Sequence, residues 1–364
     1  MKYLVVLTRR KKVSSFIAFL VAVLIVVGCN IISATGNEPT TRDKFLWPFA
    51  STSIWNMPIA SDAKYVPANL RKAEFAGADR EYFYKLKNGD PLRKVYAPGA
   101  WGQGRCTGDN YRFIELPIPD DLIIPDATNE PYFTPNNAAA FLMPDDRTLV
   151  QLGPVARCQK GAPIYGWRSF PDVDIYSDGI TGGHFGSGLS SIGGSIRKGE
   201  LVNNEPIRHA LKVVIWGKNY LYYSQSVPGF RWPAINADEN ARNQYFGKNP
   251  ALVQGSLLAI PSSVSEQSLN LETLAGKKIF KALQDYGAYI VDDAGWDAHY
   301  LAVEDGVTEE FKNKFGYEFE GRTGSFYEDF MKLFQALQIV DNNTADSVGG
   351  GGTRRASLAP PISN

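Results

Sequence analysis

Histidine and cysteine are scarce in this chain, with three of each among 364 residues. Neither histidine nor glycine stands in a familiar functional spacing, because the sequence contains no H-E-x-x-H, no G-x-G-x-x-G and no G-K-S/T. These absences exclude the helical zinc-hydrolase motif, the dinucleotide-binding fingerprint and the phosphate-binding loop.

Net charge is also lacking, since 38 Lys and Arg residues balance 38 Asp and Glu residues. Residues 1–28 hold basic residues and no acidic ones, so the rest of the chain is acidic by about five charges. That balance gives no support for nucleic-acid binding. It also disfavours a polyanionic substrate, unless basic side chains gather in one groove.

The N-terminus has the pattern of an export signal. A basic start is followed by an apolar run from Phe16 to Gly28, which is short for a membrane span. Val26-Val27-Gly28-Cys29 resembles a bacterial lipobox. We therefore expect a signal peptide over residues 1–28, lipidation at Cys29, a tether over 29–44, and an exported lipoprotein that meets the membrane only through its lipid. A plain signal peptide is the alternative.

Two cysteines remain after Cys29. In an exported chain, Cys106 and Cys158 most simply form one disulfide between two loop-like segments. A free catalytic thiol is not expected.

Residues 45–340 predict one β-rich domain, and residues 341–364 predict a disordered tail. Short runs rich in β-branched and aromatic residues, bounded by Gly, Pro, Asn or Asp, predict many strands. The stretch 210–225 predicts a hairpin, and apolar periodicity predicts helices over 271–286 and 326–340. We expect a mainly β fold, a β-sandwich or jelly roll with a few peripheral helices.

Eight glycines surround His184 between Gly179 and Leu201. Glycine lets backbone N–H groups approach a ligand closely, Ser187 adds a hydroxyl, and His184 can exchange a proton near neutral pH. This stretch is either the wall of a site or a glycine-rich loop without a function of its own.

His209 lies at the entry of the strong strand pattern that follows. Arg197 and Glu200 stand just before it, in a segment that could pair with this strand. Such a trio suits acid–base chemistry with an electrostatic helper. A structural His209–Glu200 pair is the alternative.

A third group follows another strand pattern, where Asp292, Asp293, Asp297 and His299 crowd around Trp296. Loops at strand ends often carry functional carboxylates, although a turn of solvated acids would look the same. No cofactor is predicted. A divalent metal held by histidines and carboxylates is left open, with unknown ligands.

Tryptophans fall mostly beside Gly, Pro and Asn, as loop residues do. Trp101, Trp167, Trp232 and Trp296 are candidates for stacking on sugar rings. Ordinary packing is the alternative for each of them.

Four segments, "STSIWNMPI", "IRHALK", "FRWPAINAD" and "IFKALQDYGAYIVDDAG", occur in this order. The chain resembles a broad, uncharacterised set of secreted bacterial proteins with S-x-W-N-x-P-I, I-x-H-A-L and A-L-x-x-Y-G-A-Y-V-V-D motifs. The resemblance marks Glu200, His209 and Asp292 but implies no reaction. Arg197–Leu201 also resembles the R-x-x-E-L of jelly-roll alginate lyases, whose Q-I-H and Y-x-K-x-G-x-Y-x-Q motifs are absent here.

Together these patterns predict an exported enzyme that cleaves a polysaccharide, with hydrolysis favoured. His209, Glu200, Asp292, His184 and Arg197 are the expected catalytic residues. The expected substrate-binding residues are Trp101, Trp167, Trp232, Trp296, Ser187 and His299.

Two alternatives stay open. One is β-elimination on a uronate-containing glycan, with His209 or a tyrosine as the base and Arg197 neutralising the carboxylate. The other is a non-catalytic lipoprotein that binds carbohydrate or cell wall. The enzymatic hypotheses predict one cleft that gathers His184, His209, Glu200 and Asp292.

Overall fold

The computed structural model describes residues 39–128, 137–168 and 170–363. The expected signal peptide and Cys29 lie outside these residues. The strands are β1 (Tyr65–Pro67), β2 (Phe75–Lys85), β3 (Leu92–Tyr96), β4 (Tyr111–Pro117), β5 (Ala139–Leu142), β6 (Thr148–Leu152), β7 (Val155–Ala156), β8 (Ile164–Gly166), β9 (Val173–Asp174), β10 (Leu211–Trp216), β11 (Leu257–Ala259), β12 (Ala288–Ala294), β13 (Ala298–Glu304) and β14 (Gln338–Val340). The helices are α1 (Gly217–Tyr220), α2 (Ala241–Gln244), α3 (Glu266–Leu269), α4 (Leu274–Asp285), α5 (Val307–Phe315) and α6 (Ser325–Ala336), with 3₁₀ turns at Arg105–Thr107 and Val348–Gly350.

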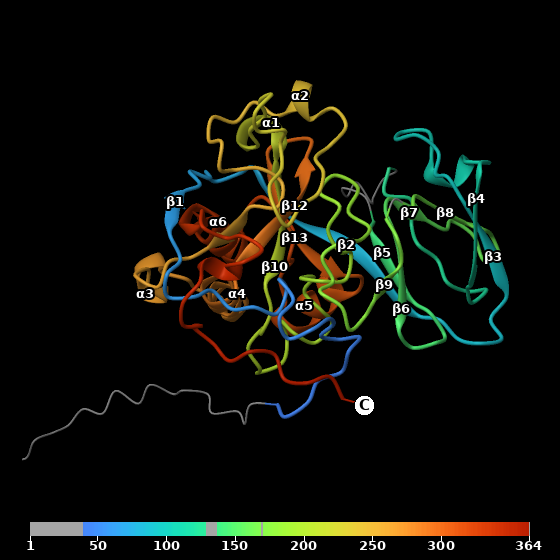
Figure 1. Ribbon diagram of the computed structural model, residues 1–364, viewed down its shortest axis with the longest axis horizontal. Helices are drawn as coiled ribbons and strands as arrows, with labels where there is room; N and C mark the ends of the chain where they lie inside the picture. The colour runs from blue at the N-terminus through green and yellow to red at the C-terminus, as the bar shows by residue number, and fades with distance from the viewer. Residues whose placement is uncertain (1–38, 129–136, 169, 364) are drawn as a thin grey trace, which may run out of the picture. The chain divides into compact units, whose positions relative to one another are not determined.

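The strands form two sheets, and the expectation of a mainly β fold is confirmed (Figure 1). The larger sheet has the order β1-β14-β11-β12-β10-β13-β2-β5-β6-β9, and the smaller one the order β4-β3-β8-β7. Three neighbouring pairs of the larger sheet are parallel, namely β10 with β12, β13 with β2, and β2 with β5.

The larger sheet buries apolar side chains on both faces. In β10, Leu211 and Val213 enter one core, which they share with α4, α5 and α6, whereas Val214 enters a second core on the opposite face. Alternating residues of a strand point to opposite faces, so a central strand with two covered faces reads as a nearly continuous apolar run. The one charged residue in this strand, Lys212, therefore points into the interior with Val214.

The expected hairpin at 210–225 is wrong. After β10 the chain turns into α1, and β10 pairs with β12 and β13 instead. A strand buried on both faces obtains its hydrogen bonds from two central neighbours, which here come from distant sequence. The helix expected over 326–340 also ends early, at Ala336, because residues 338–340 form β14.

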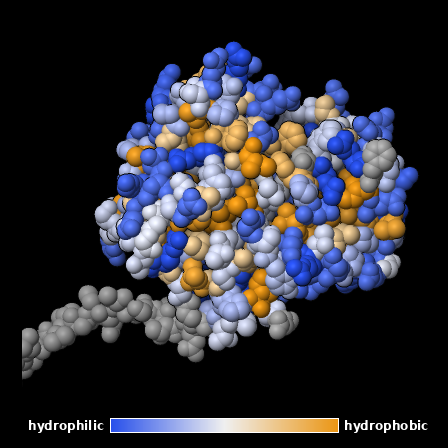
Figure 2. All heavy atoms as spheres, in the orientation of Figure 1, coloured by the Kyte–Doolittle hydropathy of each residue, from blue (hydrophilic) through white to orange (hydrophobic). Residues whose placement is uncertain are grey.

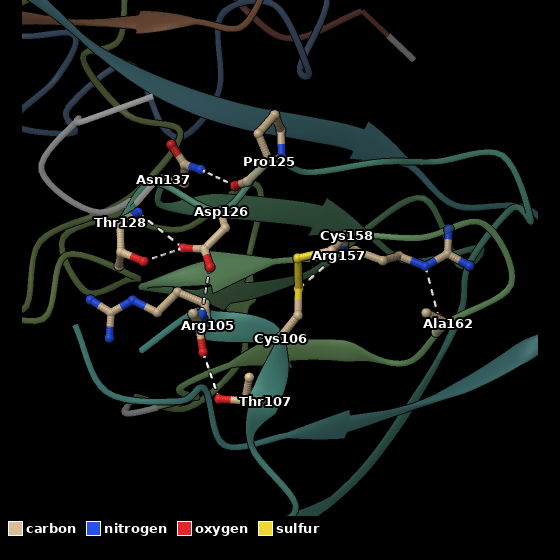
Figure 3. The surroundings of a disulfide bond; sticks show 11 residues. Arg105, Cys106, Thr107, Pro125, Asp126, Thr128, Asn137, Arg157, Cys158 and Ala162 are labelled. Carbon is tan, nitrogen blue, oxygen red and sulfur yellow. Dashed lines mark hydrogen bonds between the residues drawn. A yellow bond between two sulfur atoms is a disulfide. The ribbon is translucent and has the colours of Figure 1, made fainter. Parts of the chain in front are cut away.

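The predicted disulfide is confirmed. Cys106 and Cys158 are bonded with their Cα atoms 6.2 Å apart, and they join a 3₁₀ turn to the loop after β7 (Figure 3). Beside them the Asp126 carboxylate accepts hydrogen bonds from the backbone N–H of Arg105, at 2.6 Å, and from Thr128. The bond therefore fixes the loops at one end of the smaller sheet.

The C-terminal segment is ordered through residue 363, so the expected disordered tail is a wrong prediction. Asn343 is buried and accepts a hydrogen bond from the Gly349 N–H at 2.9 Å. Ser363 donates from its N–H to the Arg42 carbonyl at 2.8 Å. The polar residues that suggested disorder are used in hydrogen bonds to the rest of the fold. Residues 39–44, expected in a tether, belong to the same compact unit.

On the visible face, apolar residues lie in short strips between hydrophilic ones (Figure 2). Scattered exposed apolar residues are normal for a folded protein. Among the described residues, no helix combines the length and the apolar character that a bilayer crossing requires.

Candidate functional site

Three central strands, β2, β10 and β12, place charged side chains on the same face of the larger sheet. In β2, Ala76 and Ala78 enter the helix-covered core, so Asp79 and Glu81 point to the opposite face. Lys212 of β10 shares that face with Val214. All three charged side chains are buried.

A bulge adds a carboxylate to this face. The pairing of β10 with β12 shifts between Val213 and Val214, so that Val214 lies opposite Asp292. An extra residue in one strand re-aims the side chains that follow it. Asp292 therefore joins the face that carries Lys212. We call Asp79, Glu81, His184, Lys212 and Asp292 the inner cluster.

Lys212 is the centre of the inner cluster. Its Nζ lies 2.6 Å and 2.8 Å from the two carboxylate oxygens of Glu81, and it donates to the carbonyls of Ser190 and Ser191 at 3.1 Å and 2.6 Å. His184 Nε2 lies 2.6 Å from Glu81 Oε1 and 3.1 Å from Lys212 Nζ. Its Nδ1 lies 3.9 Å from Asp292 Oδ2.

Burial and mutual charge shift the pKa values of the inner cluster. Burial, helped by the charge of Glu81, raises the pKa of Asp79 to about 7. Burial and Lys212 lower the pKa of His184, but hydrogen bonds to Asp292 and Glu81 outweigh them and raise it overall. Burial lowers the pKa of Lys212 despite its contact with Glu81. The cluster therefore holds exchangeable protons near neutral pH.

The glycine-rich stretch covers the inner cluster with backbone. A Cβ at Gly182 or Gly183 would meet the side chains of Gln151 and Ser191, and a Cβ at Gly193 would meet the Trp55 ring. The glycines thus permit close packing, and this packing brings the Ser190 and Ser191 carbonyls to Lys212. His184 itself is 2 % exposed, so this part of the stretch does not line an open site.

A second pair, Glu200 and His209, lies at an open pocket of about 300 Å³, which we call the outer pocket. His209 Nε2 is 3.1 Å from Glu200 Oε2, and its Nδ1 is 2.9 Å from the Ala210 carbonyl oxygen. The side chain of Glu200 is 23 % exposed and that of His209 is 7 % exposed. Glu200 is thus the member of the pair that a ligand reaches first.

The partners of His209 fix its protonation. Both ring nitrogens face oxygens that only accept hydrogen bonds, so the doubly protonated ring beside an ionised Glu200 satisfies every contact. Burial alone would lower the pKa of His209, but the charge and hydrogen bond of Glu200 raise it overall. Burial would raise the pKa of Glu200, and His209 lowers it overall. The pair carries one proton that its two members share.

Arg197 supports the outer pocket from behind. It is 2 % exposed, and its Nε donates to Glu304 Oε2 at 2.9 Å. Its Nη1 donates to the carbonyls of Phe45 and Leu46, while its Nη2 is buried without a hydrogen-bond partner among the described residues. Its backbone N–H also donates to Glu200 Oε2 at 2.7 Å, which orients that carboxylate.

The two constellations are neighbours but do not share a pocket. Ser195 connects them, because its hydroxyl donates to Glu81 and it lines a small cavity together with Arg197 and His209. That cavity measures about 10 Å³, roughly the size of one water molecule. The expectation of a single cleft with His184, His209, Glu200 and Asp292 is therefore wrong.

Within the part of the chain that the structure describes, two groups of side chains have the donor atoms for a metal ion. Asp79, Glu81 and His184 form one, but Lys212 already supplies a cation there. Asp238, Asp292 and Asp293 form the other, with oxygens within 4.8 Å of one another. Burial and neighbouring carboxylates raise the pKa of Asp238 to about 6 and of Asp293 to about 8. An all-carboxylate set suits a hard cation such as Ca²⁺ or Mg²⁺ better than zinc.

The expected substrate-binding residues lie elsewhere. Ser187 and His299 are fully buried, which contradicts a role in contacting a polymer. His299 stacks on Phe334 with ring centroids 4.6 Å apart, and burial lowers its pKa to about 4. Asp297, from the same acidic stretch, is not among the residues that could hold a metal.

None of the four expected tryptophans lines the outer pocket. Trp101 and Trp167 lie under the guanidinium groups of Arg105 and Arg112, and Trp296 packs on Phe75. Trp232 packs against the second core. The tryptophan that does line the pocket is Trp47, which sequence reasoning passed over.

Other residues of the site were also missed. The strand pattern of 75–85 alternates apolar residues with Asp79 and Glu81, and Lys212 interrupts an apolar run. Charges inside such patterns are a signal for a buried polar cluster. Arg42 also lines the outer pocket, but nothing in the sequence marks it as a site residue, because its polar segment predicts a tether.

Comparison with known proteins adds nothing to the geometry, since no family model, no curated protein and no solved structure matches this chain.

Proposed function

We propose that this protein is an exported enzyme that cleaves polysaccharide chains, with the outer pocket as its catalytic site and hydrolysis as the reaction. The observation that carries the proposal is the proton-sharing Glu200–His209 pair at the edge of a pocket of about 300 Å³. His209, which holds the proton of the pair, would pass it through the carboxylate of Glu200 to the glycosidic oxygen. Asp292 does not line this pocket, but Glu205 does. Glu205 would take a proton from the water that attacks the anomeric carbon, so that the new C–O bond forms as the glycosidic bond breaks.

β-Elimination on a uronate glycan is the second candidate, because Arg42, Arg197, Lys198 and Arg208 all line the pocket. The two reactions differ in their dependence on pH. Hydrolysis needs the proton of the pair, so kcat/KM should fall as pH rises through the raised pKa of His209. Elimination needs neutral His209 as a base, so kcat/KM should rise over the same range.

The test is incubation of the purified chain, from residue 39 onward, with neutral and uronate polysaccharides. New reducing ends without absorbance at 235 nm indicate hydrolysis, and both signals together indicate elimination. H209Q and E200Q should each reduce either signal by roughly 100-fold or more. E239Q, which removes an exposed carboxylate away from the pocket, is the matched control. Binding without either signal would contradict the proposal and favour a carbohydrate-binding lipoprotein.

A further inference from the structure

The outer pocket has buried positive charge that the protein itself does not neutralise. Arg42 is 5 % exposed, and it donates to the backbone carbonyls of Pro360, Trp47 and Phe49. No carboxylate pairs with it among the described residues. Carbonyl oxygens satisfy its donors without cancelling its charge.

Arg197 adds an unused donor to the same place. Glu304 accepts from its Nε, but Nη2 has no hydrogen-bond partner in the described structure although the side chain is 98 % buried. A buried guanidinium with a free N–H is costly unless a ligand or water supplies an acceptor. Arg197 lines both the outer pocket and the small cavity beside it.

Two more cations stand at the rim. The side-chain partner of Arg208 among the described residues is Glu205, at a long 3.4 Å, and the side chain of Glu205 is 56 % exposed. Lys198 lines the pocket, and its ammonium forms no ion pair with the residues that the structure describes. The described lining contains three carboxylates, those of Asp43, Glu200 and Glu205. The four cations Arg42, Arg197, Lys198 and Arg208 outnumber these three carboxylates, so the lining is positive overall, in contrast to the negative balance of residues 29–364.

We propose that the outer pocket binds an acidic polysaccharide, and that its guanidinium groups hold a sugar carboxylate. That the ligand is a polysaccharide rests on the proposed function. That it is acidic rests on the buried cations of the pocket. Arginine matches a carboxylate with paired N–H donors, and Trp47 and Leu46 give the pocket an apolar wall for the sugar ring. Of these groups, the sequence pointed only to Arg197 as a partner for a sugar carboxylate.

The test is isothermal titration of the protein with three hexasaccharides, namely galacturonic acid, galactose and sulfated galactose, with reducing ends counted in the same samples. We expect the uronate hexamer to bind best, and its affinity to fall as NaCl is raised. R208Q and K198Q should each weaken this binding by roughly tenfold, the effect of one hydrogen bond to a charged group. R147Q, which removes an exposed arginine paired with Asp174, should leave it unchanged.

Equal binding of the neutral and uronate hexamers, or no effect of R208Q and K198Q in correctly folded protein, would overturn the inference. Binding of the sulfated hexamer alone would overturn the assignment to a carboxylate. Uronate binding without cleavage supports the inference while contradicting the proposed function. Cleavage of the neutral hexamer without preferential uronate binding supports the proposed function and contradicts the inference.

Discussion

Lys212 is a fully buried ammonium in the centre of a β-sheet, and Glu81 makes its burial tolerable. Its Nζ contacts both oxygens of that carboxylate and two backbone carbonyls. A buried ion pair contributes little net stability, but removing one partner leaves the other charge without compensation. The cost of losing Lys212 should therefore exceed the value of the pair itself.

We expect K212M to lower the free energy of unfolding by roughly 3–5 kcal/mol, because the buried charge of Glu81 would lose its ammonium partner and keep only His184 and Ser195. Urea denaturation measures the change. The control K281M removes a lysine whose side chain is 57 % exposed and paired with Asp285, and it should cost about 1 kcal/mol or less. Equal costs in the two variants would contradict the interpretation of the inner cluster.

His299 should make the protein sensitive to acid. Burial lowers its pKa to about 4, below the value of about 6.5 expected in the unfolded chain. Between these values only the unfolded state binds the proton, so its contribution to stability is complete above about pH 6.5 and is lost as pH falls. The loss amounts to roughly 3 kcal/mol by pH 4.

H299Q keeps a donor for the Arg71 carbonyl and removes the titrating ring. We expect the variant to lose less stability than the parent between pH 6.5 and pH 4, as measured by urea denaturation at each pH. Parallel curves for the two proteins would show that His299 is not responsible.

The sequence identified one pair of the site and missed the other. Glu200 and His209 lie nine positions apart beside one strand, so local pattern was enough to place them together. Asp79, Glu81 and Lys212 come from two strands that are separated by β13 in the sheet, and only the sheet order brings them together. Their charges inside apolar patterns marked them as unusual, but without the strand order no partner could be assigned.

At the scale of elements, the glycine-rich stretch serves close packing rather than ligand contact. We expect G193A to lower stability by about 1–3 kcal/mol, because a Cβ there would overlap the Trp55 ring. G295A is the matched control, since no atom lies within 4 Å of its added Cβ, and it should change stability by about 0.5 kcal/mol or less. Thermal unfolding of both variants measures the difference, and an undisturbed G193A would contradict this role.

Element types were easier to predict than element partners. Strands such as Leu211–Trp216 and Ala288–Ala294 follow from their apolar, β-branched composition. The bulge that turns Asp292 toward Lys212 left no local signal, because it depends on how β12 is paired. The supposed hairpin failed for the same reason, as β10 found both of its neighbours in later strands.

At the scale of the whole molecule, the two ends of the described chain pair with each other. Arg42 donates from its N–H to the Pro361 carbonyl at 3.0 Å and accepts from the Ser363 N–H. Polar composition predicted a tether at the N-terminal end and a disordered tail at the C-terminal end, and only the three-dimensional structure shows that the two ends bond to each other. Composition describes the average behaviour of a segment, whereas this order depends on specific hydrogen bonds.

Deletion of residues 360–364 should weaken both stability and uronate binding, because Arg42 loses the Pro360 carbonyl that accepts from its Nε at 2.6 Å. We expect a loss of roughly 1–3 kcal/mol in urea denaturation, as for a buried group left without its partner. Deletion of Asn364 alone is the control. If the longer deletion left the affinity for the uronate hexamer unchanged, the C-terminus would have no part in binding at the outer pocket.

The place where the chain enters the described fold determines which side of the protein would face an anchoring surface. Pro39, the first residue that the structure describes, is itself part of the outer pocket's lining. Anything covalently attached upstream, including a lipid at Cys29, would thus be joined to the chain at the outer pocket, where we propose that a polysaccharide binds. Immobilising the protein by that end on a surface should slow access by long glycans more than by short ones, whereas immobilisation through a distant lysine should not.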